Sequence, residues 1–282
     1  MNRLNVWRFR WHLACTIQRR DLRATLYSFG PYVTLSAAIA IAATILRNYV
    51  KSVQDGGLDI LSNPFAIPLF GAVVLSSIYL AIVSTTTIAR ERDQGTLEVL
   101  FYGPVDATAY LLGKYLAQAS TCVLMNVVYL AVFWLYALVT NFAFDPSLFW
   151  AAILSVAITS AVVAVSILLS TLYRSVRGAL STLLAITLVF LGVQLGHDYA
   201  ARLTGQLARG QSNPLLLLQA ILAWLDRILN WLSPFAYLER GMDALLRDNT
   251  GEYLLMLGLS LLYTAVAFGL AVWTLRRKGA CG

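Results

Sequence analysis

The chain has 282 residues, of which 59% are hydrophobic and only 12% are charged, and its formal net charge is +7. Soluble domains carry about 25% charged residues, so this composition excludes an ordinary soluble domain and indicates an integral membrane protein. The basic residues lie beside apolar stretches, as membrane orientation requires, and we therefore expect no nucleic-acid partner. The three cysteines are far apart in sequence, which indicates neither a metal site nor a disulfide framework.

The first element expected is a helix within residues 1–28 that lies along the cytoplasmic membrane surface. One face of this helix carries Leu4, Trp7, Trp11 and Ala14, which recur every three to four residues. Tryptophan favours the headgroup level and arginine favours an anionic inner leaflet, and the segment contains both. The alternative is a disordered basic tail, against which the two tryptophans argue.

Apolar stretches follow that are long enough, or nearly so, to cross a bilayer as helices, which requires about 20 residues. The six predicted spans are residues 29–46, 65–88, 110–139, 147–173, 179–196 and 253–275. Helices are expected because lipid offers no partner for unpaired backbone groups, and the alternating strands of a membrane barrel are missing. The predicted fold is therefore all-α, a single polytopic transmembrane domain over residues 1–282.

The distribution of lysine and arginine sets the expected orientation. With the N-terminus inside, fourteen of the 21 basic residues fall in cytoplasmic segments. The positive-inside rule then places both termini in the cytoplasm and makes residues 197–252 an external segment. We expect a multi-pass protein of the plasma (inner) membrane.

The external segment contains a further apolar stretch, residues 214–232. Asp226 and Asn230 interrupt it, and together with Gln219 they share one helix face. A seventh span here would also send the basic C-terminal residues outside. We therefore favour an amphipathic helix, interfacial or re-entrant at the outer side, and a spanning helix is the alternative.

The predicted membrane interior lacks charge, since no Asp, Glu, His, Lys or Arg lies deep within any span. Lys114, near the cytoplasmic end of the third span, is expected to extend to the interface. Ion paths and proton relays normally need such groups, so the energy for any transport is expected from outside the bilayer. Four milder polar residues are candidates for lining a pathway, although such groups more often bond neighbouring helices: Ser76, Tyr79, Thr86 and Asn126.

A compact charged segment, ARERDQGTLEVLFYGPV, joins the second and third spans. Gly95 allows a backbone turn and Thr96 is a suitable N-cap. Glu98 would lie in the first helical turn, where the helix dipole favours a negative charge. Pro104 follows a glycine and forms a stop signal. The sequence thus predicts a short cytoplasmic helix over residues 96–102.

This segment resembles the signature of membrane permeases of the type-2 ABC transporter family. The matching pattern is Glu91-x-x-x-Gly95-Thr96-x-Glu98-x-Leu100-x-x-x-Pro104. Two further stretches resemble the family's third span and the entry to its last span: LLGKYLA and SPFAYLERGMDALLRDNTGEYLL, the second with its Arg240-Gly241 pair. The resemblance covers the whole topology, but the apolar helix at 214–232 departs from it and leaves the external face open.

The resemblance implies that residues 96–102 form a coupling helix that docks on a separate ATP-binding subunit. The residues implied for contact or for shaping that helix are Glu91, Gly95, Thr96, Glu98, Leu100, Phe101 and Pro104. It also implies two copies of the ATPase subunit, which would bind ATP and Mg, and a second permease subunit, identical or homologous, in a lipid bilayer. This chain has no G-x-x-x-x-G-K-[ST] loop, so we expect it to bind no cofactor and to be no enzyme.

The function expected from this resemblance is that of the permease subunit of an ABC exporter, which forms the translocation pathway. The alternatives are a membrane scaffold or assembly subunit without its own pathway, and an ion-coupled secondary carrier. The substrate stays open, because an apolar pathway with hydroxyl groups suits lipids, drugs and peptides equally.

Overall fold

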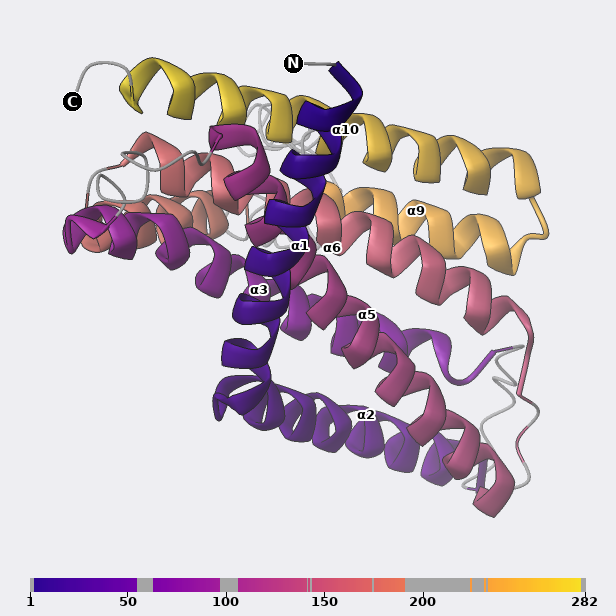
Figure 1. Cartoon of the computed structure of the whole chain (residues 1–282). Helices are drawn as coiled ribbons and strands as arrows, with labels where there is room; N and C mark the ends of the chain where they lie inside the picture. Colours follow the sequence, from indigo (N-terminus) through magenta and orange to yellow (C-terminus); the bar gives the residue numbers. More distant parts are fainter. Residues whose placement is uncertain are drawn as a thin grey trace, which may run out of the picture.

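In a computed structural model, the residues described are 3–54, 63–96, 106–140, 142, 144–173, 175–190, 224, 231 and 233–279. Within these ranges the chain is helical and contains no strand, which confirms the predicted all-α fold. The helices are α1 (Arg3–Tyr27), α2 (Gly30–Gln54), α3 (Ala66–Asp93), α5 (Ala107–Thr140), α6 (Ser147–Leu172), α9 (Pro234–Leu246) and α10 (Thr250–Gly279), with a shorter helix at Val176–Phe190 (Figure 1).

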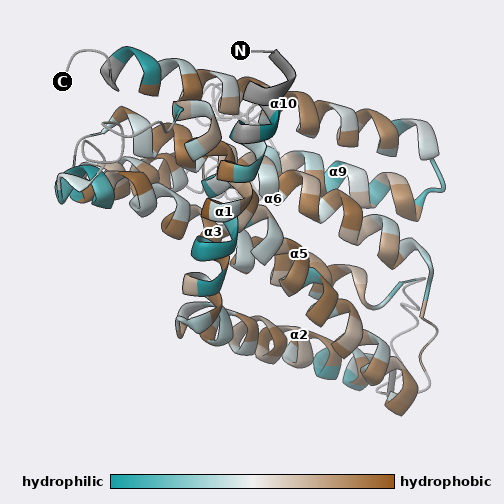
Figure 2. Cartoon of the chain, viewed as in Figure 1, coloured by the Kyte–Doolittle hydropathy of each residue, from teal (hydrophilic) through white to brown (hydrophobic). Residues whose placement is uncertain are grey.

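Five of these helices are long and apolar enough to cross a membrane: α2, α3, α5, α6 and α10. Hydrophobic residues run along most of their length (Figure 2). They correspond to five of the six predicted spans and extend beyond most of the predicted ends. The remaining span, predicted at 179–196, overlaps the apolar helix Val176–Phe190, and its last residues lie outside the described part. That span stays a prediction, as does the helix at 214–232.

Helix α1 crosses the spans instead of running with them (Figure 1). It packs along the first part of α5 and carries an arginine-rich surface. This crossing direction is the one expected of a helix along the membrane surface, and the surface position of the N-terminal segment stays a prediction. We call this side of the bundle, where α3 ends and α5 begins, the α1 end. The opposite end is where α2 ends and α3 begins.

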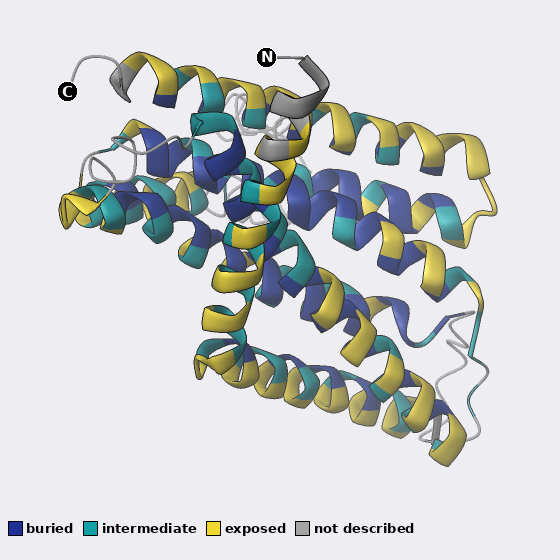
Figure 3. Ribbon diagram, viewed as in Figure 1, coloured by how far each residue is buried: buried dark blue, intermediate teal, exposed yellow. Residues whose placement is uncertain are grey.

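Helix α6 is the centre of the bundle. It packs against α3, α5, α9 and α10, and 72% of its most apolar stretch is buried, against 17% for α2 and 28% for α10 (Figure 3). Its sequence is rich in alanine and serine, which let neighbouring helices approach closely. The outer helices α2 and α10 consequently present most of their surface to lipid or to another protein.

The short helix α9 lies beside the first half of α10 at the opposite end (Figure 1) and packs on α6. Gly241 makes this contact close, because a Cβ atom there would collide with Leu154 Cδ2. Leu154 is fully buried. The Arg240-Gly241 pair that the sequence singled out is therefore, at its glycine, a helix-packing position.

Candidate functional site

A cluster of charges joins three helices at the α1 end, and we call it the ionic junction: Arg20, Asp21, Glu91, Tyr110 and Lys114. Lys114 of α5 is its centre, with Nζ 2.6 Å from Glu91 Oε1 and 2.7 Å from Asp21 Oδ2. The Lys114 side chain is only 6% exposed. The prediction that Lys114 extends to the interface is therefore wrong. Two carboxylates from neighbouring helices surround the ammonium group, and a buried charge needs such partners.

Glu91 lies in the last turn of α3, and both of its carboxylate oxygens contact side chains of α5. Oε1 contacts Lys114, and Oε2 accepts a hydrogen bond from the Tyr110 hydroxyl. The Arg20 guanidinium lies 3.1 Å from Asp21 Oδ1 and 3.9 Å from Glu91 Oε1. Two carboxylates thus face two cations, so the junction carries no net charge at neutral pH.

Helix α1 is held on α5 by close packing as well as by charge. A Cβ atom on Gly113 would lie 2.8 Å from Ile17 Cβ and 2.9 Å from the Ala14 carbonyl oxygen. Gln18 Nε2 donates to Ser120 Oγ at 2.8 Å. The glycine of the LLGKYLA stretch is therefore required by the approach of α1, and the lysine after it by the ionic junction.

The end of α3 is also fixed to α6. Arg92 Nη1 donates to the carbonyl oxygens of Thr171 and Tyr173, at 3.1 and 3.2 Å. These carbonyls belong to the C-terminal end of α6, where the last turn leaves acceptors without helical partners. One turn of α3 therefore contacts α5 and α1 through Glu91 and α6 through Arg92.

Beyond this turn, Gly95 and Thr96 end α3. Gly95 has a φ of +69°, a left-handed conformation that favours glycine, which confirms the predicted turn. The Thr96 hydroxyl donates back to the Glu91 carbonyl oxygen at 2.9 Å. Whether it also caps a following helix depends on residues outside the described part, where Glu98, Leu100, Phe101 and Pro104 also lie. The helix at 96–102 stays a prediction.

The candidate pathway residues make hydrogen bonds within the chain. Ser76 and Tyr129 share a buried hydrogen bond of 2.5 Å between α3 and α5. Asn126 accepts a bond of 2.7 Å from Ser155, which joins α5 to α6. The other two are half-buried: the Thr86 hydroxyl donates to the Val83 carbonyl, and the Tyr79 ring lies against Gly30.

Sequence reasoning missed Asp21 and Tyr110 as members of the ionic junction. Asp21 is the sole acidic residue among the first 28, which is a signal that it has a specific basic partner. Tyr110 precedes Lys114 by four residues and so shares its helix face. Neither signal identifies the partner, because the partners lie on different helices.

Five long apolar helices, a polar helix across them and charged contacts at one end define a polytopic integral membrane protein. The profile of one protein family, described as "ABC-2 family transporter protein", matches residues 33–280. The chain therefore belongs to the ABC-2 transporter family and is a transmembrane subunit of an ABC transporter. A search of curated proteins gave no significant match.

Proposed function

We propose that this chain is the permease subunit of an ABC exporter, driven by a separate ATPase subunit that docks at residues 96–102. The ionic junction is the observation that supports this role. It fixes the last turn of α3 to α1 and α5, and Arg92 fixes the same turn to α6. This turn directly precedes residues 96–102, which we call the connector. A displacement of the connector would therefore move four helices together.

The orientation proposed is the one that puts the α1 end in the cytoplasm of a plasma-membrane protein. Arginines are frequent on α1, and two more, Arg276 and Arg277, lie in the last turns of α10. Arg277 lies over the Trp273 ring, 4.0 Å from its centroid, a pairing suited to the membrane interface. Both termini and the connector would then face the ATPase.

Within this scheme we assign Glu91 to positioning instead of direct ATPase contact. Both of its carboxylate oxygens are occupied inside the chain. Glu98 and the apolar residues of the connector, Leu100 and Phe101, would contact the ATPase. Gly95 and Pro104 would set where the connector begins and ends.

The complete transporter would contain two permease subunits, identical or homologous, and two ATPase subunits that bind ATP and Mg. ATP-driven closure of the ATPase pair would shift the permease between two arrangements, because nucleotide favours one of them. This chain would contribute the pathway and no covalent chemistry.

The test is a charge reversal at the connector. In the complex purified with its ATPase, Glu98→Lys should release the ATPase and abolish the stimulation of ATP hydrolysis by the permease. The matched control is Glu252→Lys, an exposed glutamate in the first turn of α10 at the opposite end, which should change neither. Unchanged ATPase binding and turnover in the Glu98 variant would contradict the proposal.

A further inference from the structure

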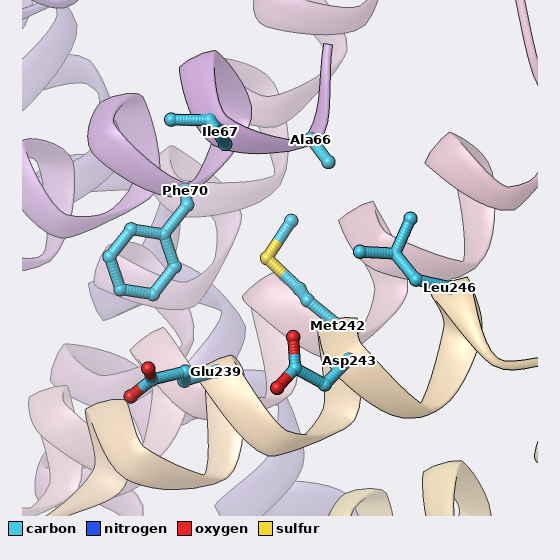
Figure 4. A pocket seen from close by; sticks show the side chains of 7 residues that line it. All are labelled: Ala66, Ile67, Phe70, Glu239, Met242, Asp243 and Leu246. Carbon is cyan, nitrogen blue, oxygen red and sulfur yellow. The ribbon is translucent and has the colours of Figure 1, made fainter. Parts of the chain in front are cut away.

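A groove of about 290 Å³ opens at the opposite end of the bundle, between the start of α3 and α9. Its lining is mainly apolar and comprises Ala66, Ile67, Phe70, Glu239, Met242, Asp243 and Leu246. Figure 4 shows the carboxylates of Glu239 and Asp243, one turn apart on α9, along the same side of the groove. Both residues are exposed, and neither side chain has an ion pair or hydrogen bond within the described residues.

A basic pair with the same spacing lies near the end of α2. Arg47 and Lys51 are four residues apart and exposed, and they too form no ion pair within the described part of the chain. Each pair therefore presents two like charges about 6 Å apart along a helix axis. Two such pairs of opposite sign are complementary.

The two pairs also lie at about the same level along the bundle. Helices α2 and α3 pack side by side and run in opposite directions, and Ile45 Cδ1 would lie 4.0 Å from a Cβ atom on Gly71. At 1.5 Å per residue, Arg47 and Lys51 lie about 3 and 9 Å beyond that level. The α3 part of the groove, from Gly71 back to Ala66, covers about the same interval, 0 to 7.5 Å.

The exposed face of α2 that leads to the basic pair carries several small residues, namely Ser36, Ala37, Ala40, Ala43 and Thr44, beside the larger Tyr32, Val33 and Ile41. The exposed face of α10 carries more large apolar side chains, namely Leu254, Leu255, Leu261, Leu262, Val266, Leu270 and Trp273. Small residues let two membrane helices approach closely, whereas large apolar side chains suit lipid.

We propose that two copies of this chain pair through these surfaces, with Arg47 and Lys51 of each copy against Glu239 and Asp243 of the other. A two-fold axis along the membrane normal keeps every residue at its own depth, so the equal depth of the two pairs is what such a dimer needs. The same contact then forms twice. The inference rests on the proposed function, in which two permease subunits enclose one pathway.

A cross-link tests the contact directly. Lys51→Cys and Asp243→Cys are introduced together into a chain whose three native cysteines are replaced by serine. A short bismaleimide in native membranes should then give a covalent dimer, which neither single variant gives in comparable yield. The control pair is Lys51→Cys with Leu255→Cys, placed on the exposed face of α10 near its first turns. A dimer from the control pair in equal yield, or none from the test pair, would overturn the contact.

A charge swap tests whether the pairs hold the dimer together. When Arg47 and Lys51 are both replaced by Glu, each contact between the two copies brings four negative charges together. Their repulsion should lower the dimeric fraction about tenfold. Adding Glu239→Lys and Asp243→Lys to the same chain should restore it. If Glu239→Lys with Asp243→Lys alone leaves the dimer intact but weakens binding of a fluorescent lipophilic cation, the groove is a ligand site and the dimer contact is overturned.

The proposed function and this dimer contact can be disproved independently. A stable dimer that still binds the ATPase, yet gives no cross-link at residues 51 and 243, would overturn only the contact. A chain that forms no dimer and binds no ATPase in wild-type form would overturn both.

Discussion

The two regions of the bundle that hold helices together by polar contacts use different chemistry. At the α1 end, Lys114 pairs with two carboxylates at 2.6 and 2.7 Å. In the interior, the contacts are neutral: Ser76 with Tyr129, and Asn126 with Ser155. Charged groups cost much more free energy than hydroxyls or amides at membrane depth, which explains why the ion pairs among the described residues lie at the α1 end and not in the interior.

This difference determines how each region responds to change. A buried ion pair adds little net stability, but breaking it leaves an uncompensated charge, which is costly. A neutral hydrogen bond between membrane helices contributes little to stability, and removing it costs less free energy than breaking a buried ion pair. The ionic junction should therefore be the place where one substitution has the largest effect, and the interior the place where effects are small.

Lys114→Met should give the largest loss of stability. It leaves Asp21 and Glu91 close together with only the exposed Arg20 as a cation, and these two acidic side chains are 15% and 21% exposed. We expect the free energy of unfolding to fall by about 3 kcal/mol, the lower end of the range for breaking a buried pair, because solvent partly screens them. Reversible unfolding in mixed detergent and SDS micelles measures this.

A compensated variant sharpens the same test. Adding Asp21→Asn and Glu91→Gln to Lys114→Met removes both carboxylates and should recover at least half of the lost stability. If the triple variant is as unstable as the single one, packing and not charge dominates at this site, and the contrast between the two regions disappears.

Gly113→Ala should have the next largest effect. The added methyl group would lie 2.9 Å from the Ala14 carbonyl oxygen, which belongs to backbone and cannot move unless α1 moves. Overpacking of this kind costs about 2 kcal/mol. We expect lower stability and faster proteolysis within α1. Gly258→Ala is the matched control, since nothing lies within 4 Å of its added Cβ, and it should be neutral or slightly stabilising.

Arg92→Gln should have a smaller effect on stability and a clear one on coupling. It removes the charge from two hydrogen bonds to carbonyl oxygens at the end of α6. Since the glutamine amide can still donate there, we expect a loss of about 1.5 kcal/mol, the lower end for one bond to a charged group. In the complex with the ATPase, stimulated ATP hydrolysis should fall while ATPase binding persists. Arg90→Gln, two residues earlier and exposed, is the control. Equal loss of stimulation in both variants would remove the role assigned to Arg92.

The sequence was sufficient to predict the parts of the fold that depend on local patterns. Apolar length predicted five spans that the structure contains, and the glycine at 95 predicted the turn that follows α3. These features follow from residues close together in sequence. The ionic junction was not predicted, because Asp21, Glu91 and Lys114 lie on three separate helices.

The misplaced prediction for Lys114 shows the limit of local reasoning. A lysine near the end of a span normally extends to the interface, and this would hold if no carboxylate were near. Here α1 folds over the start of α5 and brings Asp21 to within 2.7 Å of the ammonium group. The close approach of α1 depends in turn on Gly113, one residue before Lys114, which the sequence showed only as part of a family-like stretch.

The smallest effect is expected in the interior, at the bond between Asn126 and Ser155. Ser155 Oγ donates to Asn126 Oδ1 at 2.7 Å, and Asn126 Nδ2 donates to the Cys122 carbonyl within its own helix. Ser155→Ala therefore leaves Asn126 with one remaining partner. We expect the coupling between Ser155→Ala and Asn126→Leu in a double-mutant cycle to be about 0.6 kcal/mol, the average for such bonds in membranes. A coupling as large as the loss caused by Lys114→Met would show that the interior depends on polar contacts as strongly as the α1 end does.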